Sequence, residues 1–201
     1  MIKLYGVPGS RAARCLWMLE ELGLEYENVP VHFATGETQK PEYLALNPNG
    51  RIPTLDDEGF VIWESMAINL YLARRYGGGL WPASDRDQAL AVQWSFWGMT
   101  EIEPPLMDIL MNRAFLPEDQ RDATVAAASE ERLERPLAAL ERALEGRDQL
   151  VGASFTVADL NVASILSWGP LFGGQDLSPY PRVKTWLQAC SGRPALARLR
   201  T

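Results

Sequence analysis

The first part of the chain alternates between short apolar runs and stretches in which apolar residues recur at helical spacing. The first helical stretch places Ala12, Cys15 and Leu19 on one face, and Gly23 marks its end. The pattern predicts strands over residues 2–5, 26–31, 52–55 and 60–62, and helices over residues 10–22, 41–46 and 64–76. The predicted order is therefore β-α-β-α-β-β-α.

This order of elements also predicts a topology. A strand, a helix and a second strand can form a right-handed parallel crossover, and the last two strands are joined by a hairpin turn at residues 57–59. That arrangement is typical of a thioredoxin-like α/β domain, which we expect over residues 1–78.

The chain changes character beyond Gly79, because no convincing strand follows. Residues 79–84, which include Pro82, predict a linker. Residues 85–201 predict an all-α domain, a bundle of helices. The leucines from Leu133 to Leu144 follow the spacing of an amphipathic helix.

Several boundaries in this second domain are marked by particular residues. Thr156 is a predicted N-cap with Asp159 three positions on, which is a capping-box arrangement. Helices are also expected to begin at Pro181 and Pro194. Prolines inside a helix remove a hydrogen bond, so we expect Pro104-Pro105 to kink or break the long helix over residues 85–113, and Pro136 argues against a continuous leucine-rich helix.

Composition excludes several classes of protein. The 201 residues are 47% hydrophobic and carry a formal net charge of -7, which does not suit a nucleic-acid partner. Two distant cysteines, Cys15 and Cys190, make neither a disulfide framework nor a metal site. No apolar run approaches the roughly 20 residues that span a bilayer, so we expect a cytoplasmic protein with no membrane partner.

Ser10 is the first candidate for chemistry. It lies at a strand-to-helix junction, where its hydroxyl can donate to an anion held at the helix N-terminus. The alternative is that Ser10 only caps the helix.

Pro53 opens a predicted strand and is the second candidate. A cis bond there would expose the backbone N–H and C=O of Ile52 to an extended peptide. An ordinary trans proline at an edge strand is equally compatible with the sequence.

Glu64 and Ser65 open the helix after the hairpin and form the third candidate. A hydroxyl beside free backbone N–H groups can hold a carboxylate, and a neighbouring carboxylate can hold an ammonium group. Side by side they suit the head group of an amino acid. The alternative is that both merely cap the helix.

In combination, the three candidates resemble the successive parts of a glutathione transferase site. The chain is similar over its whole length to the cytosolic glutathione transferases that use a serine, such as the phi, theta, delta and zeta-like classes. The motifs that carry this resemblance are residues 5–10 (YGVPGS), 19–21 (LEE), 40–44 (KPEYL), 47–53 (NPNGRIP), 64–65 (ES) and 156–160 (TVADL).

The resemblance implies a role for each residue in handling glutathione, which is a co-substrate, with no cofactor and no metal. Ser10 would activate the thiol, Ile52 with Pro53 would pair with the cysteinyl backbone, and Glu64 and Ser65 would hold the γ-glutamyl end. Phi-like enzymes place a His and a Lys where this chain has Thr38 and Gln39. The glycine carboxylate would therefore depend on Gln39, Lys40 and Arg51.

The resemblance also implies a small hydrophobic electrophile bound between the domains and a homodimer. Val7, Met107, Met111 and Phe115 are the candidate electrophile residues, although the last three also suit ordinary bundle core. Two other functions stay open: a glutathione-dependent isomerase or dehalogenase, and a non-catalytic interaction module of the same fold.

Overall fold

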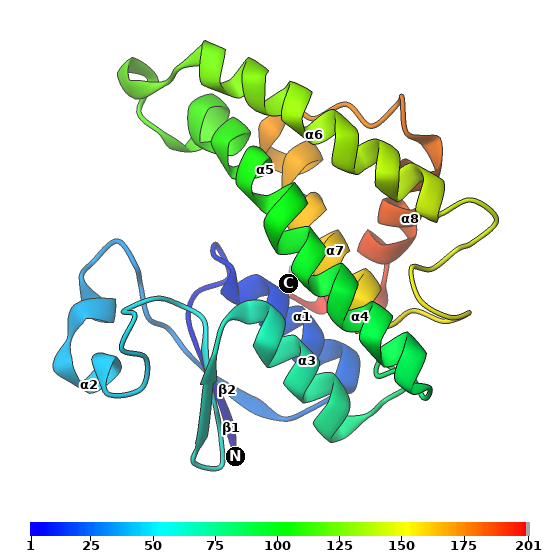
Figure 1. The fold of residues 1–201 in the computed structure, drawn as a ribbon. Helices are drawn as coiled ribbons and strands as arrows, with labels where there is room; N and C mark the ends of the chain where they lie inside the picture. Colours follow the sequence, from blue (N-terminus) through cyan, green and yellow to red (C-terminus); the bar gives the residue numbers. More distant parts are fainter. Residues whose placement is uncertain (200–201) are drawn as a thin grey trace. The chain divides into compact units, whose positions relative to one another are not determined.

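The computed structural model describes residues 1–199, which form two compact units (Figure 1). One unit runs to Trp81 and takes up the chain again from Pro194, and the other covers Pro82–Arg193. The change of unit at Trp81 falls inside the expected linker, residues 79–84. The expected second domain, residues 85–201, differs from this division at its end, and its residues 200 and 201 lie outside the described residues.

The first unit holds a four-stranded sheet in the order β2-β1-β3-β4. Its strands are β1 (Ile2–Tyr5), β2 (Tyr26–Val29), β3 (Thr54–Asp57) and β4 (Phe60–Trp63). Strand β1 pairs in parallel with β2 and antiparallel with β3, which forms a hairpin with β4. The predicted crossover, hairpin and thioredoxin-like order are confirmed.

Four helices accompany this sheet. They are α1 (Ala12–Leu22), α2 (Pro41–Leu44), α3 (Ser65–Tyr76) and α9 (Pro194–Arg198), with a 3₁₀ turn η1 over Glu37–Gln39. Figure 1 shows α1 and α3 on one side of the sheet and α2 on the other. Leu4 and Leu55 from the sheet and Ile68 and Leu72 from α3 are fully buried, so the core lies between the sheet and the α1–α3 pair.

Helix α1 is buried over more of its surface than its apolar stripe predicts. Trp17, Met18 and Arg14 are buried in addition to the predicted face. Part of the reason is that α9 packs against α1. The predicted stop is confirmed, because Gly23 adopts the left-handed conformation that ends the helix.

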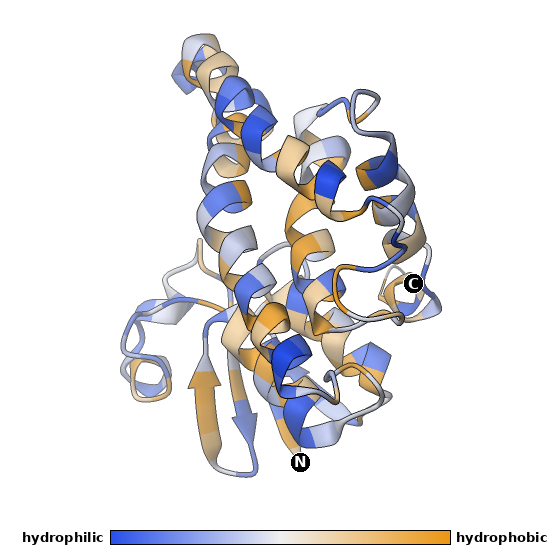
Figure 2. Cartoon of the chain, turned by 45° about the vertical axis from the view of Figure 1, so that its right-hand side comes forward, coloured by the Kyte–Doolittle hydropathy of each residue, from blue (hydrophilic) through white to orange (hydrophobic). Residues whose placement is uncertain are grey.

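Strand β4 forms one edge of the sheet and is hydrophobic along its length, as the orange arrow of the hairpin in Figure 2 shows. Phe60 and Trp63, at its two ends, are both exposed. Its partner β3 ends in the polar pair Asp56 and Asp57. The hairpin therefore presents an apolar edge.

Every regular element described in the second unit is helical, which confirms the all-α expectation. The α-helices are α4 (Asp85–Trp97), α5 (Glu103–Leu110), α6 (Ala123–Ala143), α7 (Val157–Leu166) and α8 (Pro181–Ser191). Shorter segments are η2 (Gly98–Ile102), η3 (Met111–Phe115), η4 (Glu118–Gln120) and η5 (Gly169–Gly173). Over residues 1–199, no helix is both long enough and apolar enough to cross a membrane.

The prolines interrupt this unit less than the sequence predicts. Helix α4 passes through the π-helical segment η2 into α5, whose first turn contains Pro104 and Pro105, where a missing N–H is tolerated. The amphipathic helix expected from the leucine spacing is present as α6, and it runs through Pro136, the residue that argued against its continuity, without interruption. Leu133 and Leu137 beside it are buried, so packing of the leucine face supports the helix across the proline.

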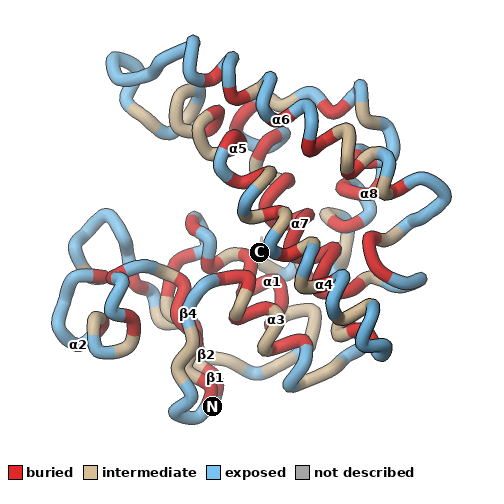
Figure 3. Tube along the Cα trace, viewed as in Figure 1, coloured by how far each residue is buried: buried red, intermediate tan, exposed pale blue. Residues whose placement is uncertain are grey.

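Helix α7 lies at the centre of the second unit. All of its residues are buried, and Figure 3 shows it in red. Thr156 caps it as predicted, and Asp159 completes the capping box. The carboxylate of Asp159 also accepts hydrogen bonds from the Leu150 N–H and the Trp186 indole, so one buried side chain ties three segments together.

Candidate functional site

Ser10 lies in the turn between β1 and α1, where it is largely buried. Its hydroxyl donates to the carbonyl oxygen of Val7 over 2.7 Å and accepts from the N–H of Ala12 over 3.1 Å. In the conformation seen, the hydroxyl therefore bonds within the turn before α1, whose N-cap residue is Arg11. To donate to a thiolate, the hydroxyl must turn its hydrogen from Val7 while its oxygen keeps the bond from Ala12.

The Ser10 turn approaches the segment that contains Ile52. Gly6, at the end of β1, has φ of 145°, and a Cβ atom there would lie 2.6 Å from the Cβ of Ala12 and 3.4 Å from that of Ile52. Only glycine fits this position. The close approach brings the thiol-activating candidate and the peptide-binding candidate into one region of the first unit.

The peptide bond between Ile52 and Pro53 is cis, which decides between the two conformations that the sequence allows. Pro53 is buried, and Ile52 is half-buried ahead of β3. Within residues 1–199, neither the N–H nor the C=O of Ile52 has a hydrogen-bond partner. These two groups therefore remain available to a peptide, as the family resemblance implies.

A network of buried side chains fixes the residue before Ile52. The carbonyl oxygen of Arg51 accepts hydrogen bonds from the Tyr43 hydroxyl at 2.6 Å and the Asn47 side chain at 2.8 Å. Both side chains also contact the hydroxyl of Thr54, on the far side of Pro53. Tyr43 of α2 and Asn47 of the turn after it thus hold both ends of the segment that carries Ile52.

Glu64 and Ser65 stand at the start of α3. Glu64 is exposed and has φ of 74° and ψ of 116°, a conformation that costs a non-glycine residue energy and is concentrated at functional sites. Ser65 is the first residue of the helix and is 4% exposed. A carboxylate beside Ser65 would meet its hydroxyl and the positive end of the α3 dipole.

The residues expected for the glycine carboxylate are not equivalent. Thr38 is buried, whereas Gln39, Lys40 and Arg51 are exposed. The amide of Gln39 donates to the carbonyl oxygen of Gly50 over 3.3 Å, which places it beside the Arg51 segment. Thr38 is thus removed from solvent, and three polar side chains remain for this part of the site.

Arg14 is a residue of the site region that the sequence did not indicate. It is 2% exposed, and its Nη1 donates to the Ser65 hydroxyl over 3.5 Å. Its neighbour Cys15 is fully buried, its Sγ lies 3.6 Å from the Ser65 carbonyl oxygen, and burial raises the pKa of its thiol. Cys15 is therefore a core residue, as expected. The one feature of the sequence that could have indicated a buried Arg14 is its position directly before this core cysteine.

Comparison with known proteins decides the family. The N-terminal domain model of glutathione S-transferases matches residues 1–74, and the C-terminal domain model matches residues 102–194. The chain belongs to the glutathione S-transferase family. Glutathione S-transferase 3 of Zea mays is 37% identical, and the match covers 98% of this chain and 92% of that protein.

Solved structures of glutathione S-transferases share the whole fold. The theta-class enzyme of Xanthomonas axonopodis pv. citri with glutathione bound superposes with a TM-score of 0.90, at 32% identity over 98% of this chain and 95% of that one. Glutathione transferase F2 of Populus trichocarpa gives a TM-score of 0.92, at 27% identity over 100% of this chain and 97% of that one. The family resemblance stated from the sequence motifs is confirmed, while the roles of individual residues stay predictions.

The residues expected to bind the electrophile of a glutathione S-transferase lie in both units. Val7 is buried in the first unit. In the second, Met107 on α5 and Met111 on η3 are half-buried, and Phe115 is 47% exposed with its ring centroid 5.9 Å from that of Phe172. Met107 and Met111 are therefore not closed into the bundle core.

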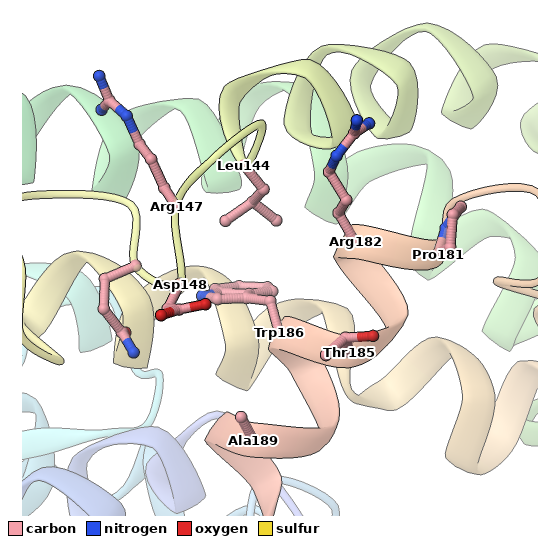
Figure 4. A pocket seen from close by; sticks show the side chains of 9 residues that line it. Leu144, Arg147, Asp148, Pro181, Arg182, Thr185, Trp186 and Ala189 are labelled. Carbon is pink, nitrogen blue, oxygen red and sulfur yellow. The ribbon is translucent and has the colours of Figure 1, made fainter.

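The second unit also contains a pocket of about 390 Å³ that includes none of these residues. It is lined by Leu144, Arg147, Asp148, Gln149, Pro181, Arg182, Thr185, Trp186 and Ala189. In Figure 4 the guanidinium groups of Arg147 and Arg182 point away from Trp186. Arg182 instead pairs with Glu141 and Glu145, so its charge is not directed at the pocket.

Proposed function

We propose that this protein is a glutathione transferase that binds glutathione on its first unit and uses the thiolate to attack small hydrophobic electrophiles. The observation that carries the proposal is that the predicted groups adjoin the start of α1. Ser10 precedes this helix, Gly6 brings Ile52 to it, and Arg14 on its first turns contacts Ser65. The relative from Xanthomonas axonopodis pv. citri supports it, since that enzyme was solved with glutathione bound.

In this mechanism the chain's task is to make a thiolate. A cysteine thiol has a pKa of about 8.5, so little of it is ionised at neutral pH. A hydrogen bond from the Ser10 hydroxyl and the N-terminal end of α1 both favour the charged form and lower that pKa. Glu64 and Ser65 hold the γ-glutamyl end, and Gln39, Lys40 and Arg51 hold the glycine carboxylate.

The test combines binding with turnover. Calorimetric titration with glutathione should show one site per chain, and Ser65→Ala should weaken it at least about tenfold, because a hydrogen bond to a charged group contributes about 1.5–3 kcal/mol. Ser129→Ala, which removes a buried serine of the second unit, is the control. Assays with a panel of electrophiles then distinguish conjugation from isomerisation or dehalogenation. A chain that does not bind glutathione would be an interaction module.

For the electrophile, Val7, Met107, Met111 and Phe115 remain our candidates. Methionine side chains adapt to ligands of different shape, which suits a range of small apolar substrates. Met107→Ala and Met111→Ala should change the order of preference among electrophiles while glutathione affinity stays constant. An unchanged order in both variants would remove them from the site.

We also propose a cytoplasmic homodimer. Large apolar side chains are exposed on both units, among them Phe60 and Trp63 on β4 and Leu90 and Phe96 on α4. Where such side chains form a contiguous patch, the patch is typical of a surface that another chain covers. Sedimentation at micromolar concentration should give a species of twice 22.4 kDa. A species of 22.4 kDa alone contradicts the proposal.

A further inference from the structure

The side chain of Arg14 is buried to an extent that is unusual for an arginine. Arginine is among the residues that are almost never fully buried unless another group holds them. Arg14 projects from α1 with 2% of its surface exposed, and its Nη1 lies 3.5 Å from the Ser65 hydroxyl oxygen at the start of α3. A positive charge therefore stands beside the residue that the proposed function assigns to the γ-glutamyl carboxylate.

This contact determines how Ser65 can bond to a ligand. A guanidinium carries only donors, whereas a hydroxyl has one hydrogen to donate and two lone pairs to accept. Because Arg14 donates to the Ser65 oxygen, the hydroxyl hydrogen is free to point elsewhere. Ser65 is 4% exposed, and no acceptor for that hydrogen is found in the described part of the chain.

We infer that Arg14 is a positioning residue of the glutathione site: it orients the Ser65 hydroxyl as a donor toward the α-carboxylate of the γ-glutamyl group. The inference rests on the proposed function, since it refines one contact of the same site. Arg14 does not touch glutathione and acts through Ser65. The positive end of α3 favours the same carboxylate, so helix and hydroxyl act on one group.

The test compares glutathione with an analogue that lacks the α-carboxylate, 4-aminobutanoyl-cysteinyl-glycine. In the unaltered protein glutathione should bind at least about tenfold more tightly than this analogue. In Arg14→Met the ratio of the affinity for glutathione to the affinity for the analogue should fall at least about threefold, while kcat at saturating glutathione changes little. Arg14→Lys keeps the charge but not the planar fork of donors, and should recover part of the ratio.

Two controls separate positioning from structural support. Met18→Ala removes another buried side chain of α1 and should leave the ratio unchanged even though it lowers stability. In a Ser65→Ala background, Arg14→Met should reduce the ratio no further, because its effect passes through Ser65. Circular dichroism establishes folding of each variant, and Arg14→Lys serves as the test if Arg14→Met does not fold.

The outcomes are distinct. An unaltered protein that binds both compounds equally, or neither, contradicts the proposed γ-glutamyl site itself. An unaltered protein that discriminates, together with Arg14 variants that keep the full ratio, overturns the inference and leaves the proposed function intact. If the affinity ratio falls further in the Arg14→Met and Ser65→Ala double variant than in Ser65→Ala alone, Arg14 acts on the ligand by a route other than Ser65. That result also overturns the inference.

Discussion

The Tyr43 hydroxyl donates to the Arg51 carbonyl oxygen over 2.6 Å, from a short helix to the residue that precedes Ile52. Removing the hydroxyl in Tyr43→Phe leaves Asn47 as the remaining side-chain donor to that carbonyl. A hydrogen bond of this kind contributes about 1 kcal/mol. We expect KM for glutathione to rise roughly fivefold with kcat nearly unchanged. Tyr26→Phe, whose hydroxyl contacts Glu20, is the matched control and should not alter KM.

Ser10→Ala tests thiol activation. The variant should bind glutathione nearly as well and conjugate it much more slowly near pH 6.5, because the bound thiol loses a donor that favours its charged form. Its rate should recover in part as pH rises and solvent deprotonates the thiol. Ultraviolet titration of the bound thiolate, with rates measured alongside, checks this. Equal thiolate pKa values in the two proteins would leave Ser10 as a cap only, and Tyr5 and Arg11 would become the candidates.

Two substitutions of Glu64 separate its contribution to glutathione binding from the strain of its backbone conformation. Glu64→Ala and Glu64→Gly both remove the carboxylate, so both should weaken glutathione at least about tenfold. Only glycine relieves the conformation at φ of 74°. Glu64→Gly should therefore be more stable than Glu64→Ala by about 1 kcal/mol in chemical denaturation. Equal stabilities would mean that this backbone stores no strain.

Alkaline pH should weaken the first unit through Tyr71. Burial, and the hydrogen bond that its hydroxyl donates to Asp57 over 2.6 Å, raise the pKa of Tyr71 to about 12 from an ordinary 10.0. The raised value belongs to the folded state, so this stabilisation is complete below pH 10 and is lost as pH rises toward 12. Chemical denaturation at pH 9 to 12 should show that the free energy of unfolding falls less steeply with pH in Tyr71→Phe than in the unaltered chain. Parallel curves would contradict the prediction.

Asp159 should be the most sensitive polar residue of the second unit. Asp159→Ala leaves the backbone N–H groups of Leu150 and Thr156 and the Trp186 indole without their acceptor. We expect a loss of about 3 kcal/mol or more in unfolding free energy, since each buried unsatisfied donor costs about 1–3 kcal/mol. Asp122→Ala removes an exposed cap of α6 and should cost much less.

Local pattern was sufficient where a single segment determines its own structure. The Gly23 stop, the Thr156 cap and the hairpin at residues 57–59 all depend on neighbours in sequence, and the structure has each of them. The parallel crossover and the hairpin followed from the order of the elements and their short connections. The candidate residues could be assigned to local elements for the same reason, because Ser10 lies in the turn before α1 and Ser65 begins α3.

The features that could not be predicted depend on contacts between residues that lie far apart in the sequence. Arg14 is a charged residue beside the apolar stripe of α1, so the helical periodicity predicts that its side chain is exposed to solvent. In the fold the side chain is buried against Ser65, which lies 51 positions away in the sequence. The conformation at Pro53 was undecided because two of the side chains that fix its segment, Tyr43 of α2 and Asn47 after it, lie earlier in the chain. At Pro136 the local penalty is visible in the sequence, whereas the packing that outweighs it is not.

The last helix makes the first unit discontinuous in sequence. Arg198 of α9 donates to the Glu20 carboxylate over 2.7 Å and to the Glu20 carbonyl oxygen over 2.8 Å, which joins α9 to α1. On the ribosome, residues 1–81 emerge first, but the helix that covers α1 emerges after the whole second unit has been translated. The first unit therefore reaches its final form only after the second unit has been synthesised, and a nonsense codon within the second unit would remove a helix that belongs to the first.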